Sequence, residues 1–574
     1  MGQRTKFAIQ IVAVAVVIIL VNFIGSKKFL RIDLTEEKIH SLSEKTIEIL
    51  QNDSLIKDEL RFEVYLEGDL PPELRKLQLA LKEKLSELKA YGGSKIYYEF
   101  IDPAKDETRK QEVYEQIFEF GLRPTKVSSL VGGSKTDQMV WGGIILRTVS
   151  NDNIPVQIMI PSNVDPKTQT AIPVFADRIP IEPIINDLEY LLLEEIYKAV
   201  NPNRKKIGFL QGHGELTEAQ RFDVTDELKK FHAVDDVVVG GKLDALKDYD
   251  ALIIAKPTKP ISEKDKYLID QFIMKGGKVA WLIDPVVVDT DSLKILDQTF
   301  GLERNLNLID EQLFTYGVRL NKNLVIDINS AKIRLGSELY NWFYYPTIDS
   351  WRIKNPIVNN VNPIRLKYSS TLDLLQNKEI TKVPLLMTSD KSVTYKVPVR
   401  INYQMIGLKE EVVKYNAQPN QIVAVMLSGK FKSNFINSLT DNFVKNSPVK
   451  FIEESVENKM LVISDGDIIN APVDSFQNSR GEMIIRPMRI NLDRDDRAAF
   501  YGNKEFFVNA MEGMMGINDL IPLRSKTITL RPLNKTKVAK ERTMWNAINV
   551  FIPMLIILVF GGFYAYLRRR KFSS

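Results

Sequence analysis

The sequence predicts a multidomain protein of mixed α/β and α+β class, with an apolar segment near its beginning and another near its end. The chain has 574 residues, which is enough for three or four domains. Short apolar strands alternate with amphipathic helices from residue 61 to residue 284, a pattern typical of α/β domains. Uncharged apolar runs occupy residues 7–24 and 547–567, and each is long enough for a membrane helix.

The run at residues 547–567 (AINVFIPMLIILVFGGFYAYL) carries no charged side chain, and the cations Arg568, Arg569, Arg570 and Lys571 follow it directly. A helix rises about 1.5 Å per residue, so about 20 apolar residues cross a hydrocarbon core of about 30 Å. A buried core helix is the alternative, but such a helix would not end in a run of cations without acidic neighbours. The run therefore predicts a C-terminal transmembrane helix.

Residues 7–24 (FAIQIVAVAVVIILVNFI) predict a second transmembrane helix at the other end of the chain. A cleaved signal peptide is the alternative, but the residues that follow (GSKK) lack a convincing A-x-A cleavage site, and the run is long for a signal peptide. If residues 568–571 lie in the cytoplasm, two membrane helices place both termini there. The bulk of the chain then lies on the other side of the membrane.

Residues 27–200 predict a first α/β domain. A helix is expected to begin near Ser43, and leucines recur every three or four residues along a helix at residues 72–90. The other expected elements are a charged helix ending at 120, a helix at 182–200, and strands at 61–66, 95–101, 139–147 and 155–160. The order βαβαββα matches a thioredoxin-like layout. Because the chain has no cysteine, a thiol redox role for this domain is excluded.

Residues 204–310 predict a second α/β domain, which begins after a polar break at residues 201–204. The expected elements are strands at 206–211, 249–255 and 278–284 and helices at 218–231 and 262–275. Strands and helices that alternate in this way predict a doubly wound parallel sheet. Ligands of such sheets bind beyond the carboxyl ends of the strands. Residues 211–215 (QGHGE), at the end of the first strand, therefore lie where a ligand is expected.

The loop at residues 211–215 is the best candidate for a ligand pocket. Its two glycines permit a tight turn and close backbone approach, and its histidine and glutamate supply titratable groups. A purely structural turn before a helix is the alternative. The dinucleotide-binding pattern is incomplete because Thr217 stands where its third glycine belongs, and Asp284 ends another strand that could share the pocket. The candidate ligand-binding residues are Gly212, His213, Gly214 and Glu215.

Residues 311–460 predict a β-rich insertion or domain, and residues 461–530 predict a return to the second α/β domain. Strands are expected at 324–328, 383–387, 397–401, 421–427 and 460–464, and a helix at 503–515. Aromatic side chains cluster at Tyr340, Trp342, Phe343, Tyr344, Tyr345 and Trp351. They could form a platform for carbohydrate or peptide, or pack beneath a loop. The triplet Asp465, Gly466 and Asp467 could be a metal loop or a turn at a strand end.

The composition and motifs argue against several classes of activity. The net charge of +5 is spread thinly over the chain and gives no argument for binding nucleic acid. The sequence contains no P-loop for ATP, no G-x-S-x-G elbow and no H-E-x-x-H motif. Its three histidines, His40, His213 and His232, are too scattered to propose a zinc set. We therefore predict no catalytic residues, no cofactor and no bound metal.

Several short stretches together resemble one family, and their order and spacing extend over nearly the whole chain. They lie at residues 31–46 (RIDLTEEKIHSLSEKT), 100–103 (FIDP), 205–215 (KKIGFLQGHGE), 423–435 (VAVMLSGKFKSNF), 464–467 (SDGD), 502–506 (GNKEF) and 523–533 (LRSKTITLRPL). The chain resembles the gliding-motility-associated ABC transporter auxiliary proteins, the GldG-like group of Bacteroidetes. The resemblance implies a component that is often labelled substrate-binding and that works with a separate permease and a separate ATPase. It also implies that the second α/β domain is related in fold to class I glutamine amidotransferases, without their activity, because the cysteine nucleophile is missing.

The resemblance and the residues together lead to one functional expectation. The chain is expected to be a non-catalytic extracytoplasmic subunit of an ABC transporter complex linked to gliding motility, coupling a large external domain to the permease and ATPase. It would lie in the bacterial inner membrane with its bulk in the periplasm, and association with further copies or other chains is left open. Gly561 and Gly562 would let the C-terminal helix pack closely on the permease. The alternative is a membrane-tethered cell-envelope enzyme or a glycan- or peptide-binding protein that uses residues 211–215.

Overall fold

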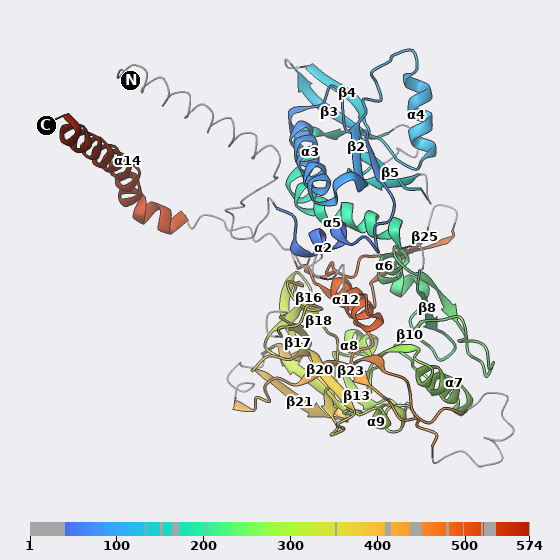
Figure 1. The fold of residues 1–574 in the computed structure, drawn as a ribbon. Helices are drawn as coiled ribbons and strands as arrows, with labels where there is room; N and C mark the ends of the chain where they lie inside the picture. Colours follow the sequence, from blue (N-terminus) through green and yellow to red (C-terminus); the bar gives the residue numbers. More distant parts are fainter. Residues whose placement is uncertain are drawn as a thin grey trace. The chain divides into compact units, whose positions relative to one another are not determined.

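The fold was analysed in a computed structural model (Figure 1). The residues that it describes are 41–131, 134–149, 153–162, 171–201, 204–349, 353–407, 415–436, 451–477, 481–496, 499–517, 521 and 535–572. The chain divides into two compact units, Met1–Thr527 and Ile528–Ser574, and each is described by itself. The transmembrane helix predicted at residues 7–24 lies outside the described residues.

The first part of the larger unit holds a four-stranded mixed sheet, order β2-β1-β5-β6, and a smaller sheet, order β4-β3-β7. Its helices are α2 (Glu44–Gln51), α3 (Pro72–Gly92), α4 (Lys110–Glu119) and α5 (Ile181–Val200). Its strands are β1 (Leu60–Val64), β2 (Ile96–Phe100), β3 (Thr125–Val131), β4 (Ser134–Val140), β5 (Gly143–Arg147), β6 (Ile154–Gln157) and β7 (Val174–Phe175). β1 pairs with β2 in parallel and with β5 in antiparallel fashion.

The helix predicted from the leucine spacing is confirmed as α3. Its inward leucines are at most 1% exposed, and they pack in one core with Phe62 and Val64 of β1: Leu74, Leu77, Leu81, Leu85 and Leu88. Burial of one leucine side chain stabilises a fold by about 1.5–3 kcal/mol, so this face holds the helix in place. The helix start at Ser43 is also confirmed, since the Ser43 side chain accepts a hydrogen bond from the Thr46 backbone N–H as the N-cap of α2.

The single strand predicted at residues 139–147 is wrong, because two strands in different sheets occupy this stretch. β4 ends at Val140 and pairs with β3, whereas β5 begins at Gly143 and pairs with β1 and β6. The chain changes sheets at Gly142, where a side chain would overlap Met159. The sequence reading also missed β3, whose polar stretch TKVSSLV shows no apolar alternation.

A seven-stranded sheet is the centre of the rest of the larger unit, with strand order β20-β23-β24-β11-β10-β8-β9. The five strands from β9 to β24 run in parallel, and β23 and β20 continue the sheet in antiparallel fashion. The strands are β8 (Lys206–Leu210), β9 (Ala233–Val237), β10 (Ala251–Ala255), β11 (Lys278–Leu282), β20 (Ile380–Met387), β23 (Ile422–Gly429) and β24 (Asn458–Ile463).

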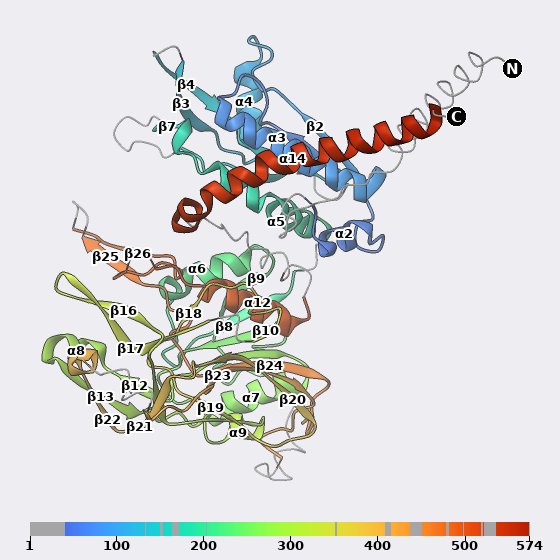
Figure 2. The ribbon, with the colours of Figure 1, turned by 90° about the vertical axis from the view of Figure 1, so that its left-hand side faces the viewer.

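Helices cover both faces of the parallel part of this sheet, as the alternation of strands and helices predicts, whereas the antiparallel strands β23 and β20 were not expected in it. Core residues of α6 (Glu218–Lys229) and α12 (Asn503–Met515) pack on one face, and those of α7 (Glu263–Met274) pack on the other. Figure 2 shows α6 and α12 on the opposite side of the strands from α7. Every residue of β10 is buried, which explains its continuous apolar sequence ALIIA. The structure confirms a mixed α/β protein, and the thioredoxin-like and amidotransferase-like relationships stay predictions.

The chain between β11 and β24 forms several small sheets. Their strands are β12 (Val286–Val288), β13 (Gln298–Glu303), β14 (Val318–Leu320), β15 (Asn323–Asp327), β16 (Ser330–Leu335), β17 (Glu338–Ile348), β18 (Ile364–Arg365), β19 (Leu372–Leu374), β21 (Ser392–Lys396) and β22 (Val399–Asn402), with short helices α8 (Thr290–Leu296) and α9 (Gln312–Thr315). The hairpin of β25 (Val473–Gln477) and β26 (Met483–Pro487) follows β24. The predicted domain bounds stay a prediction: β20 and β23 come from residues 311–460 yet extend the central sheet.

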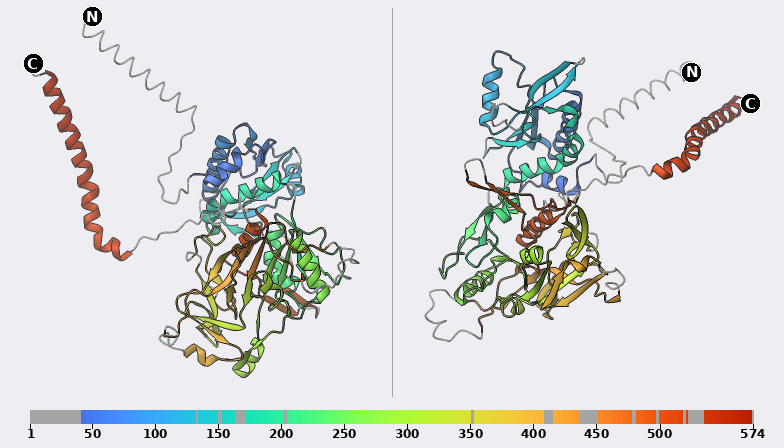
Figure 3. Two further views of the ribbon diagram at one scale, coloured as in Figure 1. Left: turned by 60° about the horizontal axis from the view of Figure 1, so that its bottom comes forward. Right: turned by 180° about the vertical axis from the view of Figure 1, so that it is seen from behind.

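The smaller unit contains one long helix, α14 (Lys535–Phe572), drawn in dark red in Figure 3. Its segment Ile548–Arg570 contains an 18-residue stretch with a mean hydropathy of 2.2, none of which is buried, so this helix is long and apolar enough to cross a membrane. Pro553 lies inside the helix. The position and length of the segment agree with the C-terminal helix predicted at residues 547–567.

Candidate functional site

The four predicted ligand-binding residues lie together at the carboxyl end of β8. Gly212 and Gly214 have φ angles of 120° and 75°, which L side chains rarely adopt, so both glycines are required by the turn. Glu215 folds back on the loop: its Oε2 accepts a hydrogen bond from the His213 backbone N–H at 2.6 Å, and its Oε1 lies 3.0 Å from His213 Nδ1. The loop is therefore fixed by its own titratable side chains.

A second carboxylate holds the other side of the His213 ring. His213 Nε2 lies 3.6 Å from Asp265 Oδ2, in the first turn of α7, and Asp265 Oδ1 accepts a hydrogen bond from the Gly241 N–H at 2.7 Å. The hydrogen bond to Glu215 is the main cause that raises the pKa of His213 above its ordinary value, although burial opposes it. The imidazole thus connects the loop after β8 with the beginning of α7.

The space beside the loop, between β8 and β10, is occupied by the chain itself. The His213 carbonyl accepts hydrogen bonds from the backbone N–H groups of Thr258 and Lys259, both at 2.9 Å, and Thr258 Oγ1 donates to the Gly214 carbonyl at 3.1 Å. A side chain on Gly214 would overlap Thr258 Oγ1. A ligand at this crevice would have to displace these contacts, so the geometry favours the structural turn, and ligand binding by Gly212, His213, Gly214 and Glu215 stays a prediction.

A cluster of buried charges joins the carboxyl ends of the next three strands. Lys256 follows β10, Asp284 follows β11, and the turn from Asp465 to Asp467 follows β24. The Lys256 ammonium group forms ion pairs with Asp467 and with Asp284, the latter at 3.4 Å. Asp284 also accepts a hydrogen bond from the Gly466 N–H. These groups hold the three strand ends together.

Burial sets the charge state of this cluster. It raises the pKa of Asp284 to about 6 and raises the pKa of Asp465 well above its ordinary value. Burial also opposes the charged form of Asp467, but the ammonium groups of Lys256 and Lys367 outweigh it and hold the pKa of Asp467 below its ordinary value. The pair of Lys256 and Asp467 is therefore ionised, and Asp284 changes its charge near pH 6.

The sequence reading missed Lys256 and did not connect the carboxylates with one another. Lys256 has a φ angle of 57°, and a residue other than glycine in this left-handed conformation costs on the order of 1 kcal/mol. One feature of the sequence could have indicated the cluster: Lys256, Asp284 and Asp465 each follow closely after an apolar strand. The triplet from Asp465 to Asp467 is a turn at a strand end, in which Asp465 Oδ1 accepts a hydrogen bond from the Asp467 N–H at 2.7 Å. The described residues contain no group of three or more His, Asp or Glu side chains placed to hold a metal ion.

The aromatic cluster is a core rather than a platform. Trp342, Phe343 and Tyr344 are buried and pack with the small sheets around β15 and β21. The Trp342 Nε1–H donates to the Tyr368 hydroxyl at 3.3 Å. Packing, the second alternative, is confirmed for Trp342, Phe343 and Tyr344, whereas Tyr340 is partly exposed and donates a hydrogen bond to Glu338. Trp351 lies outside the described residues.

The predicted docking pair, Gly561 and Gly562, lies within the apolar segment of α14. A Cβ atom added to either glycine would meet no described atom within 4 Å. The large apolar side chains on both sides of the pair, such as Phe560 and Phe563, are exposed. The helix surface at the two glycines is accordingly open to close approach by lipid or by another helix, and its docking role stays a prediction.

The fold and these sites define a class of protein: a mixed α/β protein whose strand-end charges are paired internally and whose C-terminal helix is long and apolar enough to cross a membrane. Residues 204–510 match the family described as "ABC-type uncharacterized transport system", an auxiliary domain, and the chain belongs to this family. Residues 36–147 match a second family, described as a domain of unknown function. The predicted relationship to ABC transporter auxiliary proteins is confirmed, whereas membership of the gliding-motility group of Bacteroidetes stays a prediction.

Two individual proteins are similar to parts of the chain. An uncharacterized protein of Borreliella burgdorferi is 26% identical over 281 residues, which cover 47% of this chain and 53% of that protein. The chain thus spans about half the length of this curated relative. The solved structure of the "mmIFT52 N-terminal domain" covers 54% of this chain and 97% of its own, with 10% identity and a TM-score of 0.31. At that score the likeness carries no argument about this fold.

Proposed function

We propose that this protein is a non-catalytic, membrane-anchored accessory subunit of an ABC transporter, and that it binds a separate permease and a separate ATPase. The observation that carries the proposal is the exposed apolar segment Ile548–Arg570 in a chain whose residues 204–510 belong to the ABC transport auxiliary family. The chain has no P-loop, so the energy of ATP would have to come from a partner. We extend the proposal to gliding motility because short stretches of the sequence resemble the gliding-motility-associated auxiliary proteins.

The charges around α14 support an orientation in the membrane. Arg568, Arg569 and Arg570 follow Leu567 directly, whereas the cations Lys535, Lys537, Lys540 and Arg542 lie at least five residues before the apolar run at 547–567. Cationic residues close beside a membrane helix favour the cytoplasmic side. With a second anchor at residues 7–24, both termini lie in the cytoplasm and the α/β domains lie in the periplasm of a bacterium. The anchors would then pass movements of the permease helices to the external domains.

The paired charges at the strand ends support a role without catalysis. A general acid or base must reach the proton that it transfers. His213 is instead held between Glu215 and Asp265, and Lys256 is held by carboxylates of its own chain. For this reason we do not favour the alternative of a tethered cell-envelope enzyme or a glycan- or peptide-binding protein. Alanine at both His213 and Glu215 would test that alternative by loss of an activity or of protection by a ligand.

Copurification tests the proposed function. Full-length protein extracted from its own membranes in mild detergent should bring along a polytopic membrane protein and an ATPase activity. Gly562→Leu adds a bulky side chain to the helix surface and should lower the amount of copurified partner severalfold while membrane insertion is retained. Phe560→Trp, which adds bulk at an exposed apolar position on the opposite face of the same helix, is the matched control and should copurify like the wild type. Purification without a membrane partner and without ATPase activity would contradict the proposal.

A further inference from the structure

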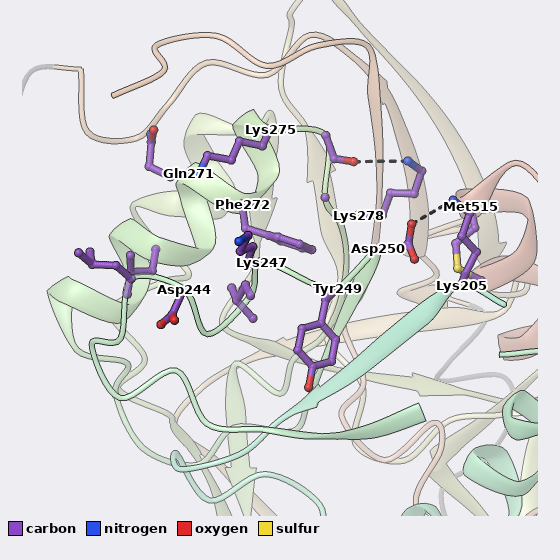
Figure 4. Close-up of a pocket in the computed structure, with 15 residues that line it drawn as sticks. Lys205, Asp244, Lys247, Tyr249, Asp250, Gln271, Phe272, Lys275, Lys278 and Met515 are labelled. Atoms are coloured by element: carbon purple, nitrogen blue, oxygen red, sulfur yellow. Dashed lines mark hydrogen bonds and ion pairs between the residues drawn. The ribbon is translucent and has the colours of Figure 1, made fainter. Parts of the chain in front are cut away.

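A cavity of about 500 Å³ lies at the amino ends of β8, β10 and β11, at the opposite end of the sheet from His213. Figure 4 shows Phe272 and Lys275 of α7 on one side of it and Lys205 and Lys278, beside the strand starts, on the other. The loop before β10 and Met515 of α12 complete the lining. Small-molecule sites typically have volumes of about 300–1,000 Å³, so the cavity has the size of a ligand site.

The lining carries more cations than anions. The lysines are Lys205, Lys247, Lys275 and Lys278, and the aspartates are Asp244 and Asp250. Asp250 is already engaged: its Oδ1 accepts a hydrogen bond from Lys205 Nζ at 3.0 Å, and its Oδ2 accepts one from the Lys206 N–H at 2.8 Å. Within the part of the chain that the structure describes, Lys247 and Lys275 have no ion-pair partner. The cavity therefore has an excess of positive charge.

Lys278 is the most buried of the four lysines in the lining. Its Nζ donates one long hydrogen bond, 3.4 Å, to the Gly276 carbonyl, and no carboxylate among the described residues forms an ion pair with it. Burial lowers the pKa of Lys278, and the neighbouring charges of Lys205 and Lys459 lower it further, although the charge of Asp250 opposes them. An anion beside Lys278 would relieve this repulsion.

Asp244, which carries a full negative charge in the lining, and the last turn of α7 oppose an anion here. The carboxyl end of a helix carries the equivalent of about half a negative charge, and α7 ends at this cavity. The two unpaired cations Lys247 and Lys275 exceed the charge of Asp244 and this partial charge together, and Lys275 lies directly at the helix end as its C-cap. The net charge of the cavity lining therefore stays positive.

Apolar side chains form the rest of the lining. Leu246, Leu268 and Phe272 are buried beneath it, and Leu243 is 46% exposed at its edge. The ring of Tyr249 adds an aromatic surface, above which Lys206 Nζ lies 4.4 Å from the ring centroid. A bound molecule would therefore meet lysines at one part of its surface and hydrocarbon at another.

We propose that this cavity binds a small organic anion, a carboxylate or a phosphate monoester on an apolar or aromatic body. Lys278 and Lys205 would contact the anionic group, and Phe272 and Leu243 would contact the apolar body. This ligand site is independent of the membrane anchor, so either proposal can fail without the other.

Calorimetric titration of the full-length protein in detergent tests the site with phenyl phosphate, benzoate and inorganic phosphate as probes. Phenyl phosphate, benzoate or both should bind saturably, and the one that binds more tightly identifies the anionic group. Inorganic phosphate should bind at least about tenfold more weakly than phenyl phosphate, because it lacks the apolar body. Leu243→Ser should weaken the binding of the organic anions and leave the binding of inorganic phosphate unchanged.

Charge-removing variants complete the experiment. Lys278→Met should weaken binding of the organic anion about tenfold or more, as expected for loss of a charge-assisted contact. Because Lys278 begins β11 and its replacement could disturb the sheet, the exposed pair Lys247→Met and Lys275→Met provides a second variant with the same expected direction. Lys259→Met, exposed at the other end of the sheet, is the control and should bind like the wild type. No saturable binding of either organic anion, or unchanged binding by both lysine variants, would overturn the proposal.

Discussion

Replacing Lys256 by methionine tests the buried charge cluster most sharply. Methionine keeps most of the volume of the lysine stem but removes the ammonium group that pairs with Asp284 and Asp467. Breaking a buried ion pair by removing one partner costs about 3–5 kcal/mol, because a buried charge is left without compensation. The Lys256 side chain is 22% exposed, so we expect the lower end, about 3 kcal/mol.

The loss should depend on pH in a defined direction. Without Lys256 the pKa values of Asp284 and Asp467 in the folded state rise, so the folded protein binds protons that the unfolded chain releases above about pH 4. A carboxyl group whose pKa is higher in the folded protein than in the unfolded chain favours folding at low pH, where it is protonated. This contribution is lost as the pH rises through the pKa of the folded protein. Asp284 already has a pKa of about 6, so the variant should be closer to the wild type at pH 5 than at pH 8.

Hydrogen exchange of the strand amides is the appropriate assay, since a single unfolding free energy is not defined for a chain with several domains. At pH 8, amides of β10 and β24 in Lys256→Met should open roughly a hundredfold more often than in the wild type, which corresponds to about 3 kcal/mol. Adding Asp467→Asn should restore part of the protection, because it removes one of the carboxylates left without a partner. Unchanged protection, or an equal loss at both pH values after correction for intrinsic exchange, would refute the reasoning.

Two further predictions concern the loop after β8. Because the pKa of His213 is raised on folding, its stabilising contribution is complete below the unfolded value of about 6.5 and is lost as pH rises through the folded value. The difference in hydrogen-exchange protection of the β8 amides between wild type and His213→Gln should therefore shrink from pH 5.5 to pH 8.5. A constant difference would contradict the proposed contacts of His213 with Glu215 and Asp265. Gly214→Ala should lower stability by about 1–3 kcal/mol, owing to a φ angle of 75° and overlap with Thr258. In hydrogen exchange of the β8 amides, Thr258→Ala should recover part of that loss, and an additive effect of the two changes would argue against the overlap.

The sequence predicted those parts of the fold that local patterns determine. The leucine spacing located α3 because the buried face of a helix repeats every three to four residues. The pairs of glycines located the turn after β8 because this backbone needs φ angles open to glycine. In contrast, β9 was missed because it is an edge strand in which Asp235 and Asp236 face solvent, so it shows no apolar run.

The candidate sites were harder to predict because they depend on strand order. Lys256 and Asp467 are 211 residues apart and meet only because β24 returns to pair beside β11. No local pattern indicates which later strand will do so. The cavity at the amino ends of the strands combines lysines from separate segments for the same reason. The paired state of His213 also depends on Asp265, which reaches it from the beginning of α7.

Crosslinking inside intact membranes tests most directly whether the chain is an accessory subunit of a transporter. Ile557 lies in the apolar segment of α14 and is 70% exposed, so a photoreactive residue at this position would react with whatever contacts the helix. We predict a covalent product of the full-length protein with a polytopic membrane protein that mass spectrometry identifies as a transporter permease. Products with lipid alone, at Ile557 and at neighbouring positions around the helix, would contradict the account.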